Sequence, residues 1–276
     1  MSTAKLNRAS VMHCARLCFL LLSLVFSLSS LNAQERILVW SDEFDGPSLN
    51  RDFWDFEHGY VRNKEYQWYQ EDNIGFEDGT LVIEARYDSL AEHSITASSI
   101  NTRRHFDFLY GQMEVRAKIP AVMGSWPAIW TLGKKYPWPS CGEIDVMEYY
   151  QIKGIPHILA NAAWGGEERW GAVWNSKRIP YSHFLEKDAA WGEKFHTWLM
   201  DWTPEYIRIY LDGELLNDID ISETVNGERG GNENPFHTPQ YILLNLAIGG
   251  TNGGEPDLAQ FPLRYIIDYV RVYKTE

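Results

Sequence analysis

The sequence contains little cysteine. Only three cysteines occur in 276 residues, and two of them, Cys14 and Cys18, lie close to the N-terminus. If the N-terminal segment is removed from the mature protein, Cys141 remains alone and no internal disulfide can form. The domain must then be stabilised by its hydrophobic core. No basic residue adjoins Cys141 in the sequence, so we expect a small buried side chain there rather than a reactive thiol.

The N-terminal segment has the pattern of a secretion signal. Three basic residues precede an apolar run at 17–28 that is too short to span a bilayer, and Ala33 is a plausible cleavage point. We therefore predict a signal peptide at 1–33, with an uncleaved anchor as the alternative. The mature protein, 34–276, is expected to be exported to the periplasm or the medium.

Basic residues are scarce in the predicted mature chain. Without residues 1–33 it has 22 basic and 38 acidic residues, a net charge of −16. Such a surface repels nucleic acid and anionic membranes, so neither is expected as a partner after signal cleavage. It also disfavours strongly sulfated or uronic polymers, and a neutral ligand fits better.

Convincing amphipathic helical patterns are absent, and no repeat or linker divides the chain. Short alternating runs separated by Gly, Pro, Asn and Asp predict strands instead. The run at 241–248 is apolar except for Asn245, as in a strand covered on both faces, and 183–189 can form one short helical turn. We predict an all-β, two-sheet antiparallel jelly-roll sandwich with a concave substrate groove. Alternating strands are expected at 81–86, 113–119, 207–211 and 266–272.

Three acids stand among apolar neighbours in Gly-Glu-Ile-Asp-Val-Met-Glu at 142–148. In a regular strand Glu143 and Asp145 share a face and Glu148 points to the other side. A β-bulge at 146–147 would bring Glu148 onto the face of the other two. Two such carboxyl groups about 5–5.5 Å apart are what a retaining glycosidase requires, and a third would push their pKa values apart.

Other interpretations of the acid triplet remain open at this point. The acids could form the solvent-exposed face of an edge strand, or the polar floor of a sugar-binding groove without catalysis. Calcium ligation is disfavoured because no ladder of a calcium loop follows.

Tryptophan is abundant, with twelve residues. Indole rings stack on the apolar faces of pyranose rings, so a row of them beside carboxylates indicates a polysaccharide groove. Trp130, Trp198 and Trp202 lie within apolar strands, where a core position is favoured. The tryptophans nearest the acids are Trp126, Trp130, Trp138, Trp164, Trp170 and Trp174.

Several motifs, in order along the chain, resemble glycoside hydrolase family 16, in particular its laminarinase-like β-glucanase branch. They are WSDEF (40–44), YGQMEVRAKIP (110–120), GSWPAIW (124–130), GEIDVME (142–148), DWTP (201–204), LNLAIGG (244–250) and DYVRVY (268–273). The resemblance covers essentially the whole predicted mature chain as a single catalytic domain. It implies a jelly-roll fold and retaining endo-hydrolysis of β-linked glucans or galactans.

The resemblance also implies individual roles. Glu143 would be the nucleophile, Asp145 its assisting carboxylate and Glu148 the acid/base. The implied substrate-binding residues are Trp126, Trp138, Asn63, Gln67 and Trp164, with the first two stacking about the cleaved bond and Asn63 and Gln67 bordering the glycone side.

No cofactor is expected for catalysis, but members of this family often carry a structural Ca²⁺ on the convex face. Glu43, the backbone of Gly79 and Asp268 stand where the resemblance places its ligands. The alternative is that these acids cap turns.

Three departures from the laminarinase pattern bear on the substrate. Ala163 stands where a His is usual, Thr251 begins a stretch that lacks the usual Trp, and Ser99 replaces a common Arg. These changes leave the chemistry intact and open the choice between a glucan and a neutral β-galactan.

The sequence thus predicts an exported, monomeric, retaining endo-β-glycanase acting on a neutral β-linked polysaccharide, β-1,3- or mixed β-1,3/1,4-glucan. An endo-β-galactanase or endo-β-galactosidase on the same scaffold is the first alternative. A non-catalytic carbohydrate-binding jelly roll is the second, although binding alone does not require a bulged acid triplet.

Overall fold

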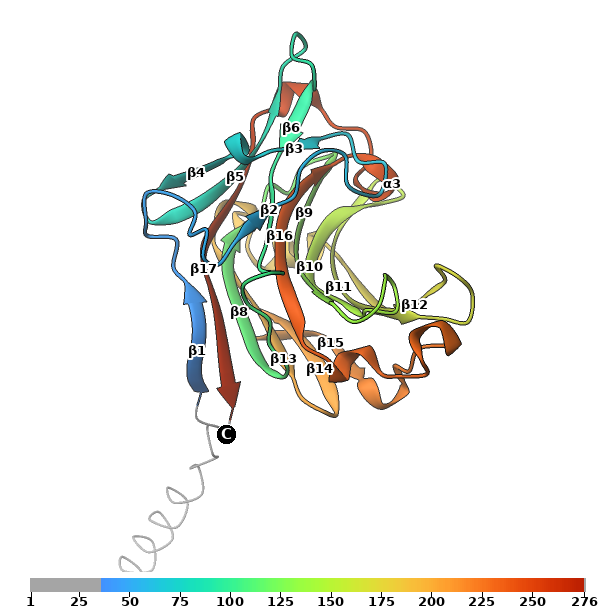
Figure 1. Cartoon of the computed structure of the whole chain (residues 1–276). Coiled ribbons are helices and arrows are strands. Elements are labelled where there is room, and N and C mark those ends of the chain that lie inside the picture. The colour runs from blue at the N-terminus through green and yellow to red at the C-terminus, as the bar shows by residue number, and fades with distance from the viewer. Residues whose placement is uncertain (1–35, 276) are drawn as a thin grey trace, which may run out of the picture. The chain divides into compact units, whose positions relative to one another are not determined.

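The computed structural model describes residues 36–275, so the predicted signal peptide at 1–33 lies outside the described residues. Two β-sheets make up most of the described chain and pack face to face as a sandwich (Figure 1). Strand pairs are antiparallel except for one short parallel pair near the end of the larger sheet. The predicted all-β jelly roll is confirmed.

The larger sheet has ten strands. They are β1 (Arg36–Asp42), β3 (Trp68–Tyr69), β4 (Ile74–Glu77), β5 (Thr80–Tyr87), β6 (Ile95–Ala97), β8 (Gly111–Lys118), β13 (His196–Trp202), β14 (Tyr206–Leu211), β15 (Glu214–Asp220) and β17 (Leu263–Thr275). Their order is β15-β14-β13-β8-β17-β5-β6-β3, with β1 beside β17 and β4 beside β5.

The smaller sheet has seven strands and forms the curved inner wall seen in Figure 1. They are β2 (Asp55–Phe56), β7 (Ser99–Asn101), β9 (Ser125–Gly133), β10 (Glu143–Ile152), β11 (Ile155–Gly165), β12 (Ala172–Pro180) and β16 (Gln240–Ile248). The order β12-β11-β10-β9-β16-β7-β2 places β9, β10 and β16 in the middle of the concave face.

Helices are few and short in residues 36–275. The α-helices are α2 (Ser182–Lys187), within the turn predicted from the sequence, and α3 (Gly250–Gly253). The 3₁₀ turns are η1 (Glu71–Asn73), η2 (Trp191–Glu193), η3 (Ile221–Glu223), η4 (Glu228–Gly230), η5 (Pro235–His237) and η6 (Leu258–Gln260). None of the helices in this part of the chain is both long enough and apolar enough to cross a membrane.

Alternating sequence becomes alternating burial where a strand has one face on the core. In β8, Met113, Val115 and Ala117 are fully buried while the intervening side chains are partly exposed. In β16 every residue is buried, as the apolar run at 241–248 predicts. One face packs in the core between the sheets, and on the other face Tyr241 and Leu243 pack beside Trp130. The burial pattern of both kinds of strand therefore follows directly from the order of apolar and polar residues.

The core between the sheets contains large aromatic side chains. Trp198 and Trp202 are fully buried, which confirms their predicted core positions. Cys141 is buried and free, and burial raises the pKa of its thiol to about 12, so the prediction of an inert side chain is confirmed.

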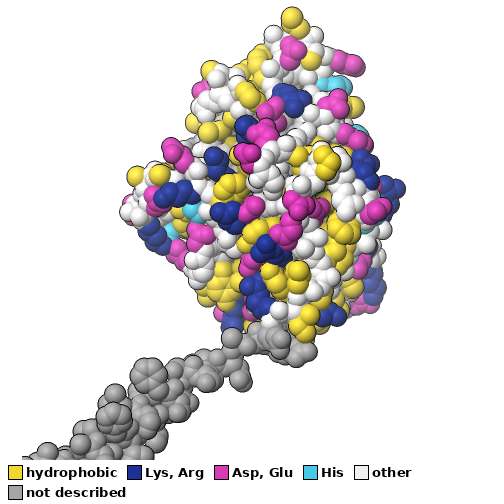
Figure 2. All heavy atoms as spheres, turned by 90° about the vertical axis from the view of Figure 1, so that its left-hand side faces the viewer, with side chains coloured by type: hydrophobic (Ala, Val, Ile, Leu, Met, Phe, Trp, Pro, Cys, Tyr) yellow, Lys and Arg dark blue, Asp and Glu magenta, His cyan; other side chains and the backbone are white. Residues whose placement is uncertain are grey.

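The side of the sandwich that carries β1 and β4 mixes basic and acidic side chains and presents no field of a single sign (Figure 2). Ion pairs such as Arg264 with Glu77 and Arg271 with Glu43 tie β17 to neighbouring segments there. Because these pairs are substantially exposed, each contributes little to stability.

Gly111 marks a close approach between β8 and β17. Its φ is +108°, and a Cβ at this position would lie 2.2 Å from the backbone oxygen of Tyr273. Gly213, in the turn between β14 and β15, also has a positive φ of +82°, but a Cβ there meets nothing within 4 Å. The two glycines thus separate the effect of backbone conformation from the effect of crowding.

We predict that Gly111→Ala lowers the free energy of unfolding by roughly 2–5 kcal/mol, because a left-handed backbone strain is added to a steric clash. Gly213→Ala, the matched control, is expected to lose only about 1–2 kcal/mol. Urea denaturation followed by tryptophan fluorescence measures both. Equal losses in the two variants would contradict the close approach of β8 to β17.

Candidate active site

A β-bulge in β10 brings the three acids together. Asp145 pairs with Trp130 of β9, but the next pair is Met147 with Ile129, so β10 carries one extra residue. The register with β11 shifts over the same interval, between Asp145 and Glu148. The bulge is the one the sequence predicts, and Glu143, Asp145 and Glu148 all line the same cavity.

That cavity is a groove of about 660 Å³ on the concave face of the smaller sheet. Its floor comes from β9, β10, β11, β12 and β16, and part of its wall comes from the segment at 62–65. The lining residues are Arg62, Asn63, Glu65, Trp126, Ala128, Trp130, Leu132, Trp138, Glu143, Asp145, Glu148, Tyr150, Asn161, Trp174, Ser176, Arg178, Asn245, Ala247 and Asn252.

Two tryptophans hold the outer acids. The indole nitrogen of Trp138 donates to Glu143 Oε2 at 2.7 Å, and that of Trp126 donates to Glu148 Oε1 at 2.8 Å. Each bond fixes a carboxylate and, equally, the plane of the ring that donates to it. Both predicted stacking residues therefore line the groove beside the acids, with their ring orientation set by a charge-assisted hydrogen bond.

Asn161 bridges Asp145 and Glu148. Its side-chain nitrogen donates to Asp145 Oδ2 at 3.2 Å and to Glu148 Oε2 at 2.9 Å. It comes from β11, where it pairs directly with Asp145, so the cross-strand register brings it to this point. Each acid of the triplet thus accepts a hydrogen bond from a fixed neutral donor.

The environment raises the pKa of all three acids, in each case chiefly through burial. For Glu143 the hydrogen bonds from Trp138 and Asp145 and the charge of Arg62 oppose the rise. The pKa of Asp145 lies well above its usual range because the charges of Glu148 and Glu143 add to the effect of burial. Of the three acids Asp145 is therefore the one whose protonated form is most favoured, and it interacts by side-chain hydrogen bonding with Glu143.

The pKa of Glu148 lies near neutral pH. Burial, followed by the charge of Glu143, raises its pKa to about 7, while the donors Trp126 and Asn161 hold it down. A carboxyl group with this pKa can both give and take a proton near neutral pH. The groove thus contains an acid that stays protonated, one that can exchange a proton, and one suited to carrying negative charge.

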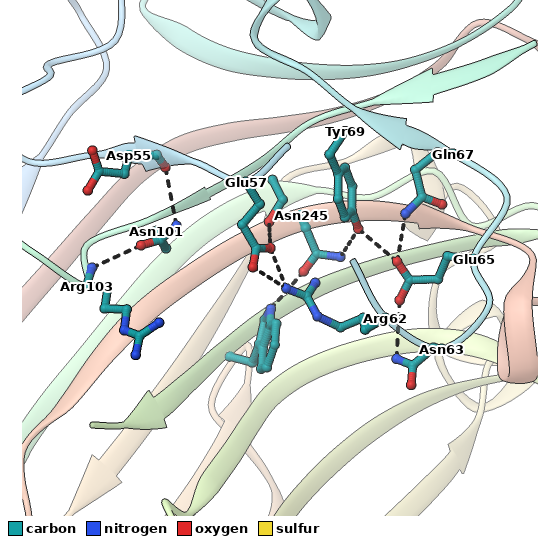
Figure 3. Close-up of polar contacts among 12 residues, drawn as sticks. Asp55, Glu57, Arg62, Asn63, Glu65, Gln67, Tyr69, Asn101, Arg103 and Asn245 are labelled. Carbon is teal, nitrogen blue, oxygen red and sulfur yellow. Dashed lines mark hydrogen bonds and ion pairs between the residues drawn. The ribbon is translucent and has the colours of Figure 1, made fainter. Parts of the chain in front are cut away.

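The segment at 62–67 contributes Arg62, Asn63 and Glu65 to the wall of the groove. Asn63 lines the groove and donates to Glu65 Oε1 at 3.2 Å, with a left-handed φ of 55°. Gln67 is fully buried, donates to Glu65 Oε2 at 2.7 Å and accepts from the backbone N–H of Ile248 at the end of β16. Figure 3 shows these side chains converging on Glu65.

Two positions differ from the expectations from sequence. Gln67 does not line the groove but supports Glu65 from beneath. Trp164 does not line it either, because Asn161 and Ala163 occupy the groove face of β11 and alternation turns Trp164 to the other side, against Phe236. Trp130 is buried, as predicted, in a small apolar cluster with Tyr241 and Leu243, and this cluster lies on the groove face of the sheet.

Other groove residues were not among the substrate-binding residues expected from the sequence, although Trp174 belongs to the row of tryptophans near the acids. Trp174 pairs with Ala163 across β11 and β12 and supplies the exposed aromatic side chain that Trp164 does not. Asn161, Tyr150 and Arg62 carry no motif of their own. Once β11 is known to pair with β10, the alternate positions 161 and 163 are the signal that identifies its groove face.

The two acids predicted as calcium ligands are paired with arginines in this structure. Both carboxylate oxygens of Glu43 accept hydrogen bonds from Arg271, and Asp268 forms an ion pair with Arg116. No group of three or more His, Cys, Asp or Glu in residues 36–275 is arranged to hold a metal ion. Because the carboxylates are already neutralised by guanidinium groups, these residues do not fit Ca²⁺ in this arrangement.

The model of the family "Glycosyl hydrolases family 16" matches residues 62–271, which is most of the chain and includes the bulged strand and the groove wall. The chain belongs to this family.

Similar proteins agree with this membership. The glycosyl hydrolase is 34% identical over 257 residues to a "Beta-glucanase" of Rhodothermus marinus, covering 86% of this chain and 85% of that protein. Its structure matches the laminarinase catalytic domain of Thermotoga maritima with a TM-score of 0.74 and 33% identity, over 88% of this chain and 99% of the other.

It matches equally well a structure from work on endo-acting O-glycanases of human gut bacteria that initiate mucin breakdown. The TM-score is 0.76 with 31% identity, over 89% of this chain and 93% of the other.

Replacing Glu143 by Gln in this glycosyl hydrolase is expected to lower the pKa of Glu148 by roughly one pH unit, because a like charge is removed from the same groove. Carbon-13 NMR titration of labelled glutamate side chains measures the change. Glu77→Gln, on β4 of the other sheet, is the control and should leave the pKa of Glu148 in place. An unchanged Glu148 titration in Glu143→Gln would show that the two acids are not coupled.

Proposed function

We propose that this glycosyl hydrolase is a retaining endo-β-glycanase that hydrolyses β-1,3- or mixed β-1,3/1,4-glucan by double displacement. The observation that carries the proposal is the bulged β10, which sets two separately held carboxyl groups, Glu143 and Glu148, on one face of an open groove. Their different donors and neighbours prepare them for different roles.

In the first displacement Glu143 attacks the anomeric carbon while Glu148 gives its proton to the leaving glycosidic oxygen. Glu143 suits the nucleophile because Trp138, protonated Asp145 and the charge of Arg62 all favour its ionised form. Glu148 suits the acid because its pKa of about 7 leaves it protonated in much of the population near neutral pH.

In the second displacement Glu148, now ionised, takes a proton from water, and that water releases the sugar from Glu143. Covalent bonding to sugar removes the negative charge of Glu143, and this loss lowers the pKa of Glu148 at the moment when it must act as a base. Asp145 does not touch the sugar in this scheme. It donates a hydrogen bond to Glu143 as the charge on that carboxylate forms and disappears.

The shape and lining of the groove support a polymer as substrate. The groove is open and lies across several strands, and exposed indoles at Trp138 and Trp174 offer faces for sugar rings. The names of the related β-glucanase and laminarinase support a β-glucan. The predicted signal peptide supports export, and we propose that the mature chain acts as a monomer.

A β-galactan or galactose-containing glycan is the second candidate. Ala163 is fully buried beneath the groove, in register with Glu143 and Trp174, where the laminarinase pattern has a His. A small side chain there removes a hydrogen-bonding group next to the nucleophile. The likeness to mucin-acting O-glycanases is consistent with this alternative.

Product profiling tests the proposal. Residues 34–276 are incubated with laminarin, barley mixed-linkage glucan, agarose and a neutral β-galactan, and the products are separated by chromatography. We expect internal cleavage of one or both glucans into oligosaccharides. Release from a galactan alone would replace the proposed substrate by the second candidate, and no cleavage of any polymer would contradict the proposed glycanase.

Azide rescue tests the assignment of the two glutamates. With a substrate that has a good leaving group, Glu148→Ala plus azide should give the β-glycosyl azide, because azide replaces water in the second displacement. Glu143→Ala plus azide, the matched control, should give the α-glycosyl azide by direct attack. Identical anomers from both variants would refute the assignment.

A substrate with a poorer leaving group provides a pH readout. In the wild-type enzyme kcat/KM should fall above about pH 7 for substrates that need protonation, because Glu148 loses its proton as pH rises. That alkaline limb should be absent in Glu148→Ala.

A further inference from the structure

Directly paired residues form a continuous row across the concave sheet. Ser176 pairs with Asn161, Asn161 with Asp145, and Asp145 with Trp130. Paired side chains on neighbouring strands point to the same face, so the four form one line across β12, β11, β10 and β9. All four line the groove that holds the acids.

The row does not stop at Trp130. That residue pairs with Leu243 of β16, Leu243 with Asn101 of β7, and Asn101 with Asp55 of β2. These last three line a second cavity of about 290 Å³, together with Phe56, Glu57, Arg103, Arg104 and Tyr241. The second cavity is therefore the same concave face continued toward the edge of the sheet, and its volume approaches that of the smallest ligand sites.

An ion pair stands where the two cavities meet. Arg62 lines only the first and Glu57 only the second, and the two side chains form an ion pair in which Nη2 of Arg62 donates to both carboxylate oxygens of Glu57. The guanidinium carbon of Arg62 lies 5.0 Å above the ring of Trp130, the residue at which the row passes from one cavity to the other. Figure 3 shows the pair between Asn101 and Asp55 on one side and Asn63 and Glu65 on the other.

The pair is held firmly in this position. Ser99 donates its hydroxyl to Glu57 Oε2 at 2.6 Å, and both charged side chains are only about one-fifth exposed, 22% for Arg62 and 20% for Glu57. Glu57 neutralises the guanidinium, so the pair is a poor site for an anionic sugar. Because the pair lies between the two cavities and is hydrogen-bonded to Ser99, it is suited to act as a barrier within the groove.

We propose that the Arg62–Glu57 pair is a specificity-determining barrier that ends the sugar-binding groove at Trp130 and closes it off from the cavity lined by Tyr241, Leu243 and Asn101. A polysaccharide chain bound across the acids then makes no contact with that second cavity. The pair limits the number of sugar units that contribute to binding on this side of the cleaved bond. This inference rests on the proposed function.

Two double variants separate the steric effect of the ion pair from the effect of its charges. Arg62→Ala with Glu57→Ala removes both side chains and opens the two cavities into one groove, in which a longer chain can reach the part lined by Tyr241 and by Arg103, whose guanidinium lies over the tyrosine ring. Arg62→Met with Glu57→Gln removes the same charges but keeps side chains of similar length in place. Loss of the Arg62 charge raises the pKa of Glu143 in both variants, so any effect on the chemical step is shared.

The measurement is kcat/KM for a series of β-1,3-gluco-oligosaccharides of increasing length, or for the series from whichever polymer product profiling identifies. In the wild type and in Arg62→Met/Glu57→Gln, kcat/KM should stop rising at the same chain length. In Arg62→Ala/Glu57→Ala it should rise for at least one further sugar unit, by about three- to tenfold, the gain expected for one added aromatic contact.

Calorimetry in the Glu143→Gln background repeats the series as a binding measurement, so that the barrier is tested even if no polymer is cleaved. The same length limit for all three proteins, or an equal change in both double variants, would overturn the proposed barrier. An extended limit only in the alanine variant supports it. A wild-type protein that binds but does not cleave would contradict the proposed function and leave the binding result to decide on the barrier.

Discussion

The burial of three carboxyl groups side by side is the constraint on which the rest of this site depends. Three negative charges cannot be kept together away from water, so one of the acids must remain protonated. The negative charge on the others must be stabilised by hydrogen-bond donors. Asp145 keeps the proton because it is the most deeply buried of the three, with 2% of its surface exposed. Trp138, Trp126 and Asn161 then supply the donors that stabilise the outer two acids.

The neighbouring architecture follows from that requirement. The donors come from β9, β11 and the loop before β10, so the acids can be satisfied only when three separate stretches of chain assemble around one strand. The bulge puts Val146 and Met147 both into the core, and these apolar side chains anchor the strand from behind. Packing on one face and hydrogen bonding on the other thereby fix the acids to a single geometry.

Sequence reasoning succeeded where a local pattern carries the information. The alternation in β8 and β14, the apolar run of β16 and the bulge in β10 could all be predicted, because period-two patterning and an acid triplet with one extra residue are visible along the chain. It failed where a side chain's role depends on its partner across strands. Trp164 and Gln67 were misplaced because nothing in their own segments tells which face they occupy. Asn161 and Arg62 were missed because their importance lies in what they touch.

The β-bulge also has a consequence in genetic terms. Because Val146 is the extra residue between Asp145 and Met147, deletion of its codon would leave the acids spaced i, i+2, i+4, and strict alternation would still set all three on one face. The triplet therefore withstands a one-codon deletion that would reverse the faces of side chains in most strands. What such a deletion would remove is one apolar anchor and the local bend of β10, so two lineages could differ by that codon and retain the same set of acids.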